Sequence, residues 1–468
     1  MPATSLGGEA RFISFRDPAG HTCVRADRVV REVHASAWAS LESFLKTPLS
    51  SQLVEEGCLV STRTVSEGNL SHTVAHERIP FVSYPFEWAP QMLQAAGHLV
   101  LSLAERVLAA GFGLKDASPY NVLFRGSNPV FVDLLSFEER TPGNAVWLPY
   151  GQFVRNFSLP LLIESRFGMP VKATFLANRD GVEPETVYQA IGPLQKLLPP
   201  VLTLVTIPTW LDRSGAVQRV NYAPSVVPPN RARFALNQLY RTGRRQLERV
   251  AARAVSESRW TSYERSCTYS FQQALQKRGF VEEALRRLHP ARLLDVGCNT
   301  GSYSRLAAQL GSEVVAIDSD PKVVGHLWTK ARAENLNILP LVIDITRPSP
   351  GMGWRNLECE SFLSRCERRF DCMVMLGIIH HLLVTERIPL ESILDLAADL
   401  TIDSLIIEYI GPEDPMFRRL LRGREHLHEG LNQESFERAF LRRFRLMEKA
   451  SIGDSGRVIY LLRRRQTV

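Results

Sequence analysis

The sequence predicts an α/β protein of two domains: a C-terminal, seven-stranded, doubly wound, Rossmann-like domain and an α+β domain before it. Three observations predict this fold class. The chain has 468 residues, which is too long for one ordinary domain. In the second half, short continuous apolar runs alternate with helical patterns, as in a parallel sheet covered on both faces. The first half instead mixes a hairpin, helices and a proline-rich segment, which is typical of an α+β domain.

Five apolar runs of the second half are expected to be parallel strands. In chain order they read ARLLDVGC, EVVAIDSD, ILPLVIDIT, FDCMVMLGII and DSLIIEYI. Each is short and is separated from the next by a helical segment, which favours buried strands. The chain then ends in FRLMEKASIGDSGRVIYLLRR, two strand patterns around a Gly-Asp-Ser-Gly turn. This pattern predicts an antiparallel hairpin at the edge of the sheet, which brings the number of strands to seven.

The first half begins with an expected β-hairpin around Asp-Pro-Ala-Gly, because proline and glycine preset the dihedral angles of a turn. A helix, SAWASLESFLKT, follows. The segment APQMLQAAGHLVLSLAERVLAAG predicts a long amphipathic helix that stops at Gly111. Prolines then concentrate between positions 199 and 229. We therefore expect a first domain at 1–225, a basic helical connector at 226–258 and a second domain at 259–468.

The composition excludes several classes of protein. Apolar residues make up 45% of the chain and charged residues 22%, so each domain can bury a core, and neither disorder nor a fibrous repeat is indicated. The net charge of +7 is spread along the chain. The basic segments have no interleaved aromatic residues and no known nucleic-acid motif. This disfavours nucleic acid as a partner and favours solvated helix faces.

The cysteines and the N-terminal segment bear on metal binding and location. The seven cysteines are scattered and none forms a Cys-x-x-Cys pair, so we expect neither a metal site nor a disulfide framework. The first residues, MPATSLGGEARFISF, lack the charged start and apolar core of a secretory signal. No apolar run approaches the roughly 20 residues that cross a bilayer. We therefore expect a cytoplasmic protein without a membrane span, whose oligomeric state the sequence leaves open.

A glycine-containing turn follows the first predicted parallel strand. Ligands of such sheets bind outside the carboxyl ends of the strands. Gly297 and Gly301, in DVGCNTG, lie where this strand turns into its helix. Glycine lets a ligand approach the backbone closely, and the helix N-terminus favours a carboxylate. Cys298 and Asn299 lie between the glycines and belong to the predicted cofactor site, while Asp295, early in the strand, is expected to hold the loop.

Acidic residues end the next two predicted strands. Asp318 ends the second strand, 23 residues after Asp295, where a carboxylate can accept hydrogen bonds from both hydroxyls of a ribose. Asp344 ends the third strand and can accept from an adenine amino group; the alternative is a cap of the strand end. Ser319 and Ile345, which follow the two acids, complete this part of the predicted cofactor site.

The motifs LLDVGCNTG, AIDSD and LGIIHHL together resemble the cofactor motifs of class I S-adenosylmethionine-dependent methyltransferases, over residues 259–468. The resemblance implies a Rossmann-like methyltransferase domain with S-adenosylmethionine as its cofactor. A dehydrogenase is the rival for the loop, but it would show the tighter G-x-G-x-x-G spacing. Class I enzymes often carry an N-terminal lid. The resemblance places Trp260, Tyr263 and Tyr269 there, with Tyr263 as the predicted cofactor contact and core packing as the alternative.

The predicted fourth and fifth strands supply the candidate catalytic residues. Methyl transfer is an in-line displacement at the sulfonium methyl, so positioning of the acceptor supplies much of the acceleration. A base is needed only where the acceptor must lose a proton. His380 and His381 follow the fourth strand, and one of them is a candidate base or orienting donor, since a neutral imidazole does either near pH 7. Glu408, in the fifth strand, is the other candidate; a purely structural role is the alternative for all three.

The segment LKDASPYNVLFRGSNPVFVDLLSFE resembles the catalytic loop of the kinase-like superfamily, in particular that of its small-molecule phosphotransferases. In a kinase, one aspartate accepts the substrate proton, an asparagine binds metal, and a second aspartate binds the metals that bridge the phosphates. Asp116, Asn121 and Asp133 have the spacing for these three roles.

Departures from the kinase pattern predict a degenerate site. No glycine-rich loop precedes the segment, and the one lysine before position 115 is Lys46, at the end of a helix, whereas kinases use a strand lysine against the phosphates. Arg28 or Arg31 is the candidate substitute, although a guanidinium is not a point charge. Asp133 is followed by Leu-Leu-Ser rather than Phe-Gly. We expect a degenerate kinase fold and disfavour Mg·ATP binding; an unrelated α+β domain with a chance spacing is the alternative.

Segments spread over nearly the whole chain resemble the bacterial methyltransferases of the rhizobial nodulation-protein-like type. They read FVSYPFEWAPQML, GLKDASPYNVLF, PVFVDLLSFE, LGIIHHLL and EYIGPEDPMFRRLL. The resemblance implies a methyltransferase for a small-molecule, glycan or biosynthetic-intermediate acceptor, with the first domain presenting or gating the substrate. A protein or RNA methyltransferase is one alternative. A bifunctional or ATP-regulated protein with a nucleotide-binding first domain is another.

Overall fold

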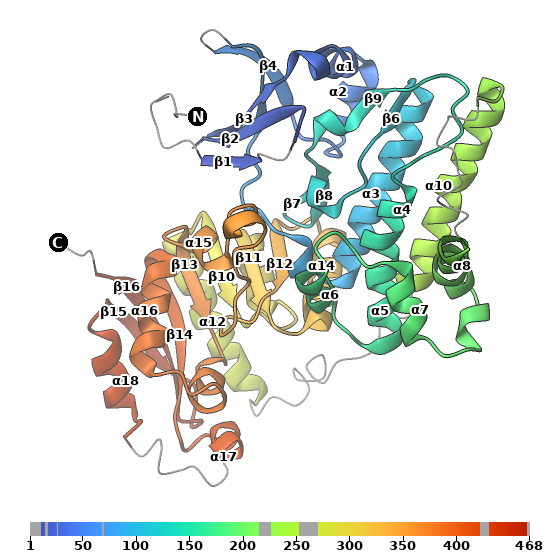
Figure 1. Cartoon of the computed structure of the whole chain (residues 1–468). Helices are drawn as coiled ribbons and strands as arrows, with labels where there is room; N and C mark the ends of the chain where they lie inside the picture. Colours follow the sequence, from blue (N-terminus) through green and yellow to red (C-terminus); the bar gives the residue numbers. More distant parts are fainter. Residues whose placement is uncertain are drawn as a thin grey trace. The chain divides into compact units, whose positions relative to one another are not determined.

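The chain divides into two compact units, each with its own sheet and buried core (Figure 1). Unit 1 comprises Met1–Ser256 and Gly353–Glu358, and unit 2 comprises Glu257–Met352 and Cys359–Val468. The computed structural model describes residues 11–14, 17–25, 27–67, 70–214, 226–251, 270–421 and 430–465.

Unit 1 begins with a five-stranded antiparallel sheet in the order β1-β2-β3-β5-β4. Its strands are β1 (Arg11–Ser14), β2 (Gly20–Val24), β3 (Arg28–Val33), β4 (Thr62–Glu67) and β5 (Leu70–Glu77). The expected hairpin is the β1–β2 pair. Two helices, α1 (Ala35–Leu45) and α2 (Pro48–Glu55), connect β3 to β4. Thr47 starts α2 by accepting a hydrogen bond from the backbone N–H of Ser50 at 3.1 Å, the usual N-cap arrangement.

The rest of unit 1 is mainly helical and is built on α3 (Pro90–Ala109), which ends before Gly111 as predicted. Gly111 has a φ of 87°, the left-handed conformation that favours glycine. Two small hairpins pair β6 (Phe112–Leu114) with β9 (Phe137–Glu139) and β7 (Val122–Arg125) with β8 (Asn128–Phe131). The helices that follow are α4 (Tyr150–Phe153), α5 (Leu159–Phe167), α6 (Val171–Ala177), α7 (Pro184–Ala190) and α8 (Ile207–Arg213). Short 3-10 or π-helical turns are η1 (Pro85–Glu87), η2 (Pro119–Asn121), η3 (Leu134–Ser136), η4 (Val154–Ser158), η5 (Gln195–Leu197), η6 (Leu202–Thr206) and η7 (Trp354–Asn356).

The segment expected to be a basic connector forms the helix α10 (Pro229–Ala251), and this helix is an element of unit 1. Its buried side includes Leu236, Tyr240 and Leu247. A Cβ on Gly97 of α3 would lie 2.9 Å from Cδ2 of Leu247, so the two helices approach closely at this glycine. The arginines of α10 that the sequence showed as a basic run lie mostly on the opposite, exposed side. Residues 252–258 of the expected connector lie outside the described residues.

Unit 2 confirms the predicted seven-stranded, doubly wound sheet, in the order β12-β11-β10-β13-β14-β16-β15. Its strands are β10 (Arg292–Val296), β11 (Glu313–Asp318), β12 (Ile338–Val342), β13 (Phe370–Met375), β14 (Thr401–Ile410), β15 (Phe444–Ser451) and β16 (Arg457–Arg464). The first five are parallel, and the last two form the predicted antiparallel hairpin. The helices are α12 (Phe271–Leu288), α13 (Ser302–Gln309), α14 (Pro321–Ala333), α15 (Phe362–Cys366), α16 (Leu390–Leu400), α17 (Pro415–Leu421) and α18 (Gln433–Phe440), with the π-helical turn η8 (His381–Thr385).

Helices cover both faces of this sheet (Figure 1). Side chains of α12, α13 and α14 pack on alternate strand residues such as Leu293, Val314 and Val374 in one buried cluster. The intervening residues of the same strands, including Leu294 and Val315, are buried on the other face. Burial on both faces explains why these strands read as continuous apolar runs in the sequence.

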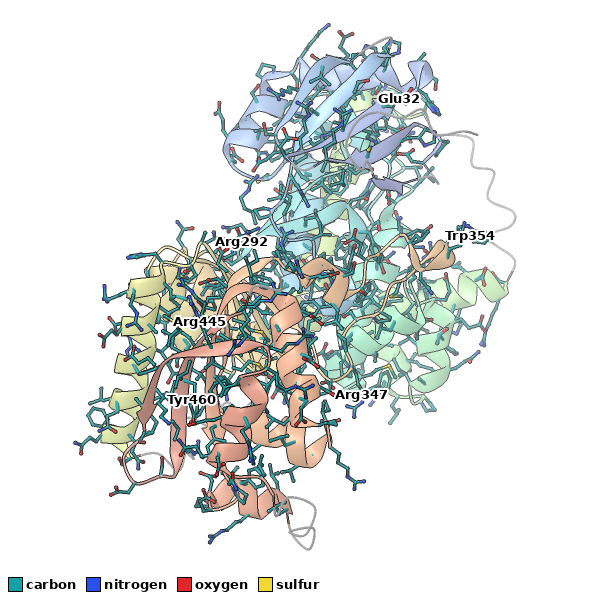
Figure 2. The ribbon with its side chains drawn as sticks, turned by 90° about the vertical axis from the view of Figure 1, so that its left-hand side faces the viewer. Glu32, Arg292, Arg347, Trp354, Arg445 and Tyr460 are labelled. Carbon is teal, nitrogen blue, oxygen red and sulfur yellow. The ribbon has the colours of Figure 1, made fainter. Side chains whose placement is uncertain are left out.

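The strand β15 lies at the open edge of the sheet and pairs with β16. Most of its side chains, among them Arg445 and Lys449, are exposed, and its register with β16 shifts between Leu446 and Glu448. On β16, the buried Tyr460 donates its hydroxyl to Oε1 of Glu437 at 2.9 Å. Figure 2 labels Arg445 and Tyr460 on these neighbouring strands.

The expectations of no membrane span and no metal site concern the residue ranges that the structure describes. There, no helix combines the length and the apolar character that crossing a bilayer requires, and the cytoplasmic location stays a prediction. Within the same ranges, no three His, Cys, Asp or Glu side chains are arranged to hold a metal ion. Six cysteines there are free thiols, namely Cys23, Cys58, Cys298, Cys359, Cys366 and Cys372.

Candidate active site

The loop between β10 and α13 requires glycine at both predicted positions. Gly297 has a φ of 74° and Gly301 a φ of 82°, conformations that other residues rarely adopt. A Cβ on Gly297 would lie 2.9 Å from Cδ1 of Ile378, and one on Gly301 would lie 2.2 Å from Cδ1 of Leu327. A side chain at either position would therefore require Ile378 or Leu327 to move, in addition to adopting an unfavourable backbone conformation.

The carboxyl end of β11 holds this loop in place. The backbone N–H groups of Gly297 and Cys298 both donate to the carbonyl oxygen of Ile317, at 2.9 and 3.0 Å. The N–H of Asn299 donates to Oδ2 of Asp318 at 3.0 Å. Asn299 has a φ of 48°, and its Oδ1 is buried without a hydrogen-bond partner among the described residues. A buried acceptor without a donor suits a bound ligand that supplies one.

Asp318 is half-buried at the tip of β11, where the sequence placed the ribose contact. Burial raises the pKa of its carboxyl, and backbone N–H groups of Asp320, Asn299 and Ser319 oppose that shift by donating to the carboxylate. The hydrogen bond from Asp320 measures 3.0 Å. These donors fix the orientation of the carboxylate, while its partial exposure leaves it able to accept further hydrogen bonds.

Asp295 lies beneath the loop and does not reach its surface. It is 3% exposed, and its Oδ2 accepts a hydrogen bond from the Ser304 hydroxyl at 2.5 Å. Burial raises the pKa of Asp295 to about 6, against the lowering effect of that hydrogen bond. Since Ser304 belongs to the first turns of α13, this contact ties β10 to the helix that the loop leads into.

Asp344 lies just beyond the end of β12, and both of its oxygens have protein partners. Oδ1 accepts from the backbone N–H and the hydroxyl of Thr346, at 2.9 and 2.6 Å, and Oδ2 accepts from Arg347 at 3.1 Å. Burial alone would raise the pKa of Asp344, but these hydrogen bonds and the charge of Arg347 lower it. The carboxylate therefore caps the turn that contains Ile345, the alternative that the sequence left open, and an adenine contact there stays a prediction.

The two histidines differ in accessibility. They follow β13 at the start of η8, and their ring centroids are 4.2 Å apart. His380 is 0% exposed, and neither ring nitrogen has a hydrogen-bond partner among the described residues. Burial, followed by the charges of His381 and Arg457, lowers the pKa of His380 to about 3. His381 is half-buried, and burial lowers its pKa too. Both imidazoles are therefore neutral at pH 7, and His381 is the one open to solvent.

Glu408 lies in a buried ion network rather than at a surface. Its Oε2 is 2.7 Å from Nζ of Lys277, and its Oε1 is 3.6 Å from Arg457, which in turn donates to Asp414 at 2.7 Å. Glu408 and Arg457 side chains are 0% and 3% exposed. A Cβ on Gly377, just before the histidines, would lie 3.9 Å from Oε2 of Glu408. The buried network therefore lies close to the turn between β13 and the histidines.

The buried role of Lys277 was not predicted from the sequence, although the pattern of its helix indicates it. On α12 the buried residues are Lys277, Val281, Ala284 and Leu285, which follow a helical spacing. A lysine on the apolar stripe of an amphipathic helix needs a buried anion. The predicted aromatic lid, Trp260, Tyr263 and Tyr269, lies outside the described residues.

In unit 1, the structure brings the three predicted kinase-like residues together. The side-chain amide of Asn121 donates to Oδ2 of Asp116 at 2.9 Å. Oδ2 of Asp133 accepts from the Ser136 hydroxyl at 2.5 Å, and its Oδ1 accepts from Nη1 of Arg31 at 2.6 Å. Both oxygens of Asp133, the aspartate predicted from its spacing to bind metal, are therefore bonded to protein groups.

Arg31, one of the two arginines proposed as substitutes for the strand lysine of kinases, lies on β3. Its guanidinium also pairs with Asp17, and its side chain is 9% exposed. His76 of β5 lies nearby: burial, followed by the charge of Arg31, lowers the pKa of His76 to about 4. Arg31 pairs with Asp133 at 2.6 Å, and its role as a substitute for the lysine stays a prediction. A strand cation, a helix after it, the Asp-x-x-x-x-Asn loop and the later aspartate give unit 1 its kinase-like arrangement.

Known proteins resemble this chain at two levels, one domain and nearly the full length. A family model described as a methyltransferase domain matches residues 269–425. Nodulation protein NoeA of Rhizobium meliloti (strain 1021) is 30% identical over 466 residues, which cover 96% of this chain and 95% of NoeA.

Two solved structures are similar over part of the chain. The N-methyltransferase NodS from Bradyrhizobium japonicum WM9, in complex with S-adenosyl-L-homocysteine, is 16% identical with a TM-score of 0.30, over 45% of this chain and 100% of NodS. The bifunctional kinase-methyltransferase WbdD is 21% identical with a TM-score of 0.30, over 43% of this chain and 41% of WbdD.

The match to NoeA extends over nearly the full length of both chains. The matched methyltransferase domain contains the glycine loop, Asp318 and both histidines. The chain therefore belongs to the family of nodulation protein NoeA and is a class I S-adenosylmethionine-dependent methyltransferase.

Proposed function

We propose that this enzyme methylates a small-molecule, glycan or biosynthetic-intermediate acceptor, and that unit 1 presents or gates that substrate. One observation carries the proposal: the half-buried Asp318 ends β11 and the half-buried His381 follows β13, and the carboxyl ends of these parallel strands share one edge of the sheet. The nodulation role in the name of NoeA supports a small acceptor over a protein or an RNA.

S-adenosylmethionine supplies an electrophilic methyl group when it is bound. Asp318 then accepts hydrogen bonds from the ribose hydroxyls, and the close approach permitted by Gly297 and Gly301 lets the backbone contact the rest of the ligand. Since the acceptor attacks in line with the departing sulfur, the protein contributes mainly by holding the acceptor in place.

His381 is the proposed base or orienting group for the acceptor. Its imidazole is neutral at pH 7 because burial lowers its pKa, so it can accept a hydrogen bond or a proton from an acceptor hydroxyl or amine. His380 lies behind it in van der Waals range of its ring and acts as a positioning residue. Glu408 is held by Lys277 and Arg457, and we assign it a positioning role as well.

Unit 1 is proposed to serve the acceptor rather than to transfer phosphate. Arg31 already neutralises Asp133, the residue that would bind metal in a kinase. A metal ion at that carboxylate would have to displace the guanidinium and lie beside its charge. This arrangement disfavours both the bifunctional and the ATP-regulated alternatives.

The cofactor assignment is tested with Asp318→Asn. Losing a charged acceptor for two hydroxyls costs about 1.5–3 kcal/mol, so calorimetry is expected to show affinity for S-adenosylhomocysteine reduced by roughly 10- to 100-fold. Asp454→Asn, at an exposed carboxylate in the hairpin turn, is the matched control and retains full affinity. Unchanged affinity in Asp318→Asn would remove the ribose assignment.

The acceptor class is tested by incubating the enzyme and methyl-tritiated cofactor with a cell extract separated into small-molecule, glycan, protein and RNA fractions. Label is expected in the small-molecule or glycan fraction. Label confined to protein or RNA would contradict the proposal. His381→Gln should lower kcat by about 100-fold while leaving the affinity for S-adenosylhomocysteine unchanged.

A further inference from the structure

The exposed side of α10 carries a line of arginines. Positions 231, 234, 238, 241, 245 and 249 recur every three or four residues, so their side chains share one face of the helix. All six are exposed; four are arginines, and Phe234 and Gln238 lie between Arg231 and Arg241. The arginine stripe consists of Arg231, Arg241, Arg245 and Arg249. Among the described residues none of the four forms an ion pair. By contrast, Arg244 on the flank of the same helix pairs with Glu105 at 2.9 Å. Glu248 is exposed beside the stripe.

A pocket of about 150 Å³ lies at the end of the arginine stripe. Its lining is partly apolar, from Leu162, Pro199, Pro200 and Val250, with Ser165 beside them. Arg166 and Arg249 supply its two positive charges. Arg166, like Arg249, has no ion-pair partner in the part of the chain that the structure describes. A partly apolar pocket with two unneutralised guanidinium groups suits an anionic head attached to an apolar body.

The chain that leads into this pocket exposes an unusual number of large apolar side chains. The apolar cluster consists of Leu194, Leu197, Leu198, Ile207, Trp210 and Leu211. Leu194 is 81% exposed, Leu197 57% and Trp210 49%. The Thr206 hydroxyl donates to the carbonyl oxygen of Lys196 at 2.7 Å, which ties the two segments of the cluster together. Leu198 is directly followed by the pocket residue Pro199. Exposed apolar groups gathered in this way mark an interaction surface.

The two features require a partner that offers phosphates and an apolar layer together. An RNA supplies phosphates for the arginines but leaves exposed leucines in water. An anionic bilayer supplies both, since arginines bind its headgroups, while leucine and tryptophan side chains enter the boundary between headgroups and acyl chains. We propose that the arginine stripe and the apolar cluster dock unit 1 on an anionic lipid bilayer, with a lipid phosphate bound between Arg166 and Arg249.

The test is flotation of the full-length protein with vesicles of phosphatidylcholine, with and without phosphatidylglycerol. The unchanged protein is expected to float with the anionic vesicles. The triple variant Arg241→Ala, Arg245→Ala, Arg249→Ala should lower the partition coefficient by on the order of 100-fold. The matched control removes three exposed arginines of unit 2, Arg278→Ala, Arg442→Ala and Arg445→Ala, and should bind within about threefold of the unchanged protein.

A second variant separates a bilayer from a nucleic acid. Leu194→Ser, Leu197→Ser and Leu198→Ser retain the charge but remove apolar contacts, so they should abolish the binding that persists at high salt. Since all three side chains are exposed, the melting temperature should not change. Failure of the unchanged protein to float with anionic vesicles would overturn the proposal. So would arginine-dependent RNA binding that the leucine variant retains, because the surface would then be a nucleic-acid site.

Discussion

Breaking the buried pair between Lys277 and Glu408 should destabilise unit 2 strongly. In Lys277→Met the stem is largely retained while the charge is lost, so the carboxylate of Glu408, 0% exposed, loses its 2.7 Å ion pair and keeps Arg457 at 3.6 Å. Removing one partner of a buried pair costs about 3–5 kcal/mol, and the remaining arginine places the expected loss at the low end, about 3 kcal/mol. For a unit of this size that lowers Tm by roughly 6–12 °C. Calorimetric unfolding measures this change in Tm. The transition of unit 2 is the one that shifts to higher temperature when S-adenosylhomocysteine is added.

Two comparisons make this prediction refutable. Arg286→Met breaks the exposed pair between Arg286 and Glu282 on the same helix, whose side chains are 61% and 32% exposed, and should cost no more than about 0.5 kcal/mol. In Lys277→Met with Glu408→Gln no lone buried charge remains. The double variant should therefore be more stable than the sum of its two single losses predicts, by about 1–2 kcal/mol. The reasoning fails if Lys277→Met costs under about 1 kcal/mol, or if the single losses add without coupling.

Three further predictions concern pH, the glycine loop and unit 1. The pKa of His380 is about 3 and that of a histidine in the unfolded chain is about 6.5, so between these values only the unfolded chain binds this proton. The free energy of unfolding should therefore fall by about 1.4 kcal/mol for each pH unit of acidification below 6.5. Urea titrations of His380→Asn should show a pH dependence that is smaller by this amount. Gly301 has a φ of 82°, and a Cβ there would lie 2.2 Å from a side chain of α14, so Gly301→Ala should lower the free energy of unfolding by about 2–4 kcal/mol. Gly311 also has a left-handed conformation but lies in open space, so Gly311→Ala should lower it by about 1 kcal/mol. Equal losses in the two variants would show that the close contact is unimportant. Mg·ATP should leave Tm unchanged because Arg31 holds Asp133, and a rise that Asp133→Asn abolishes would show a working nucleotide site.

Much of the fold is encoded in local patterns and was therefore predictable. The parallel strands are buried on both faces, which makes each a continuous apolar run. The turn at Gly297 and Gly301 and the acid at Asp318 are short-range features of a strand end. The end of α3 before Gly111 follows from the left-handed conformation of a single residue.

The parts that could not be predicted depend on partners distant in the chain. Arg31 and Asp133 are 102 residues apart, and Lys277 and Glu408 are 131 residues apart. A periodic pattern shows which face of an element is apolar but not which distant element covers it. The basic α10 is the clearest example: its charges suggested a solvated connector, whereas its other face packs on α3 through Leu247 at Gly97.

The strand β15 bears on how the protein behaves in concentrated solution. An open sheet edge offers unpaired backbone groups to any extended chain, and growth of that kind leads to aggregates. On β15, the register shift between Leu446 and Glu448 interrupts the regular edge, and the exposed charged side chains of Arg445 and Lys449 oppose pairing with a further strand. Edge-to-edge growth along β15 is therefore disfavoured, even though Leu446 and Met447 are 39% and 50% exposed there.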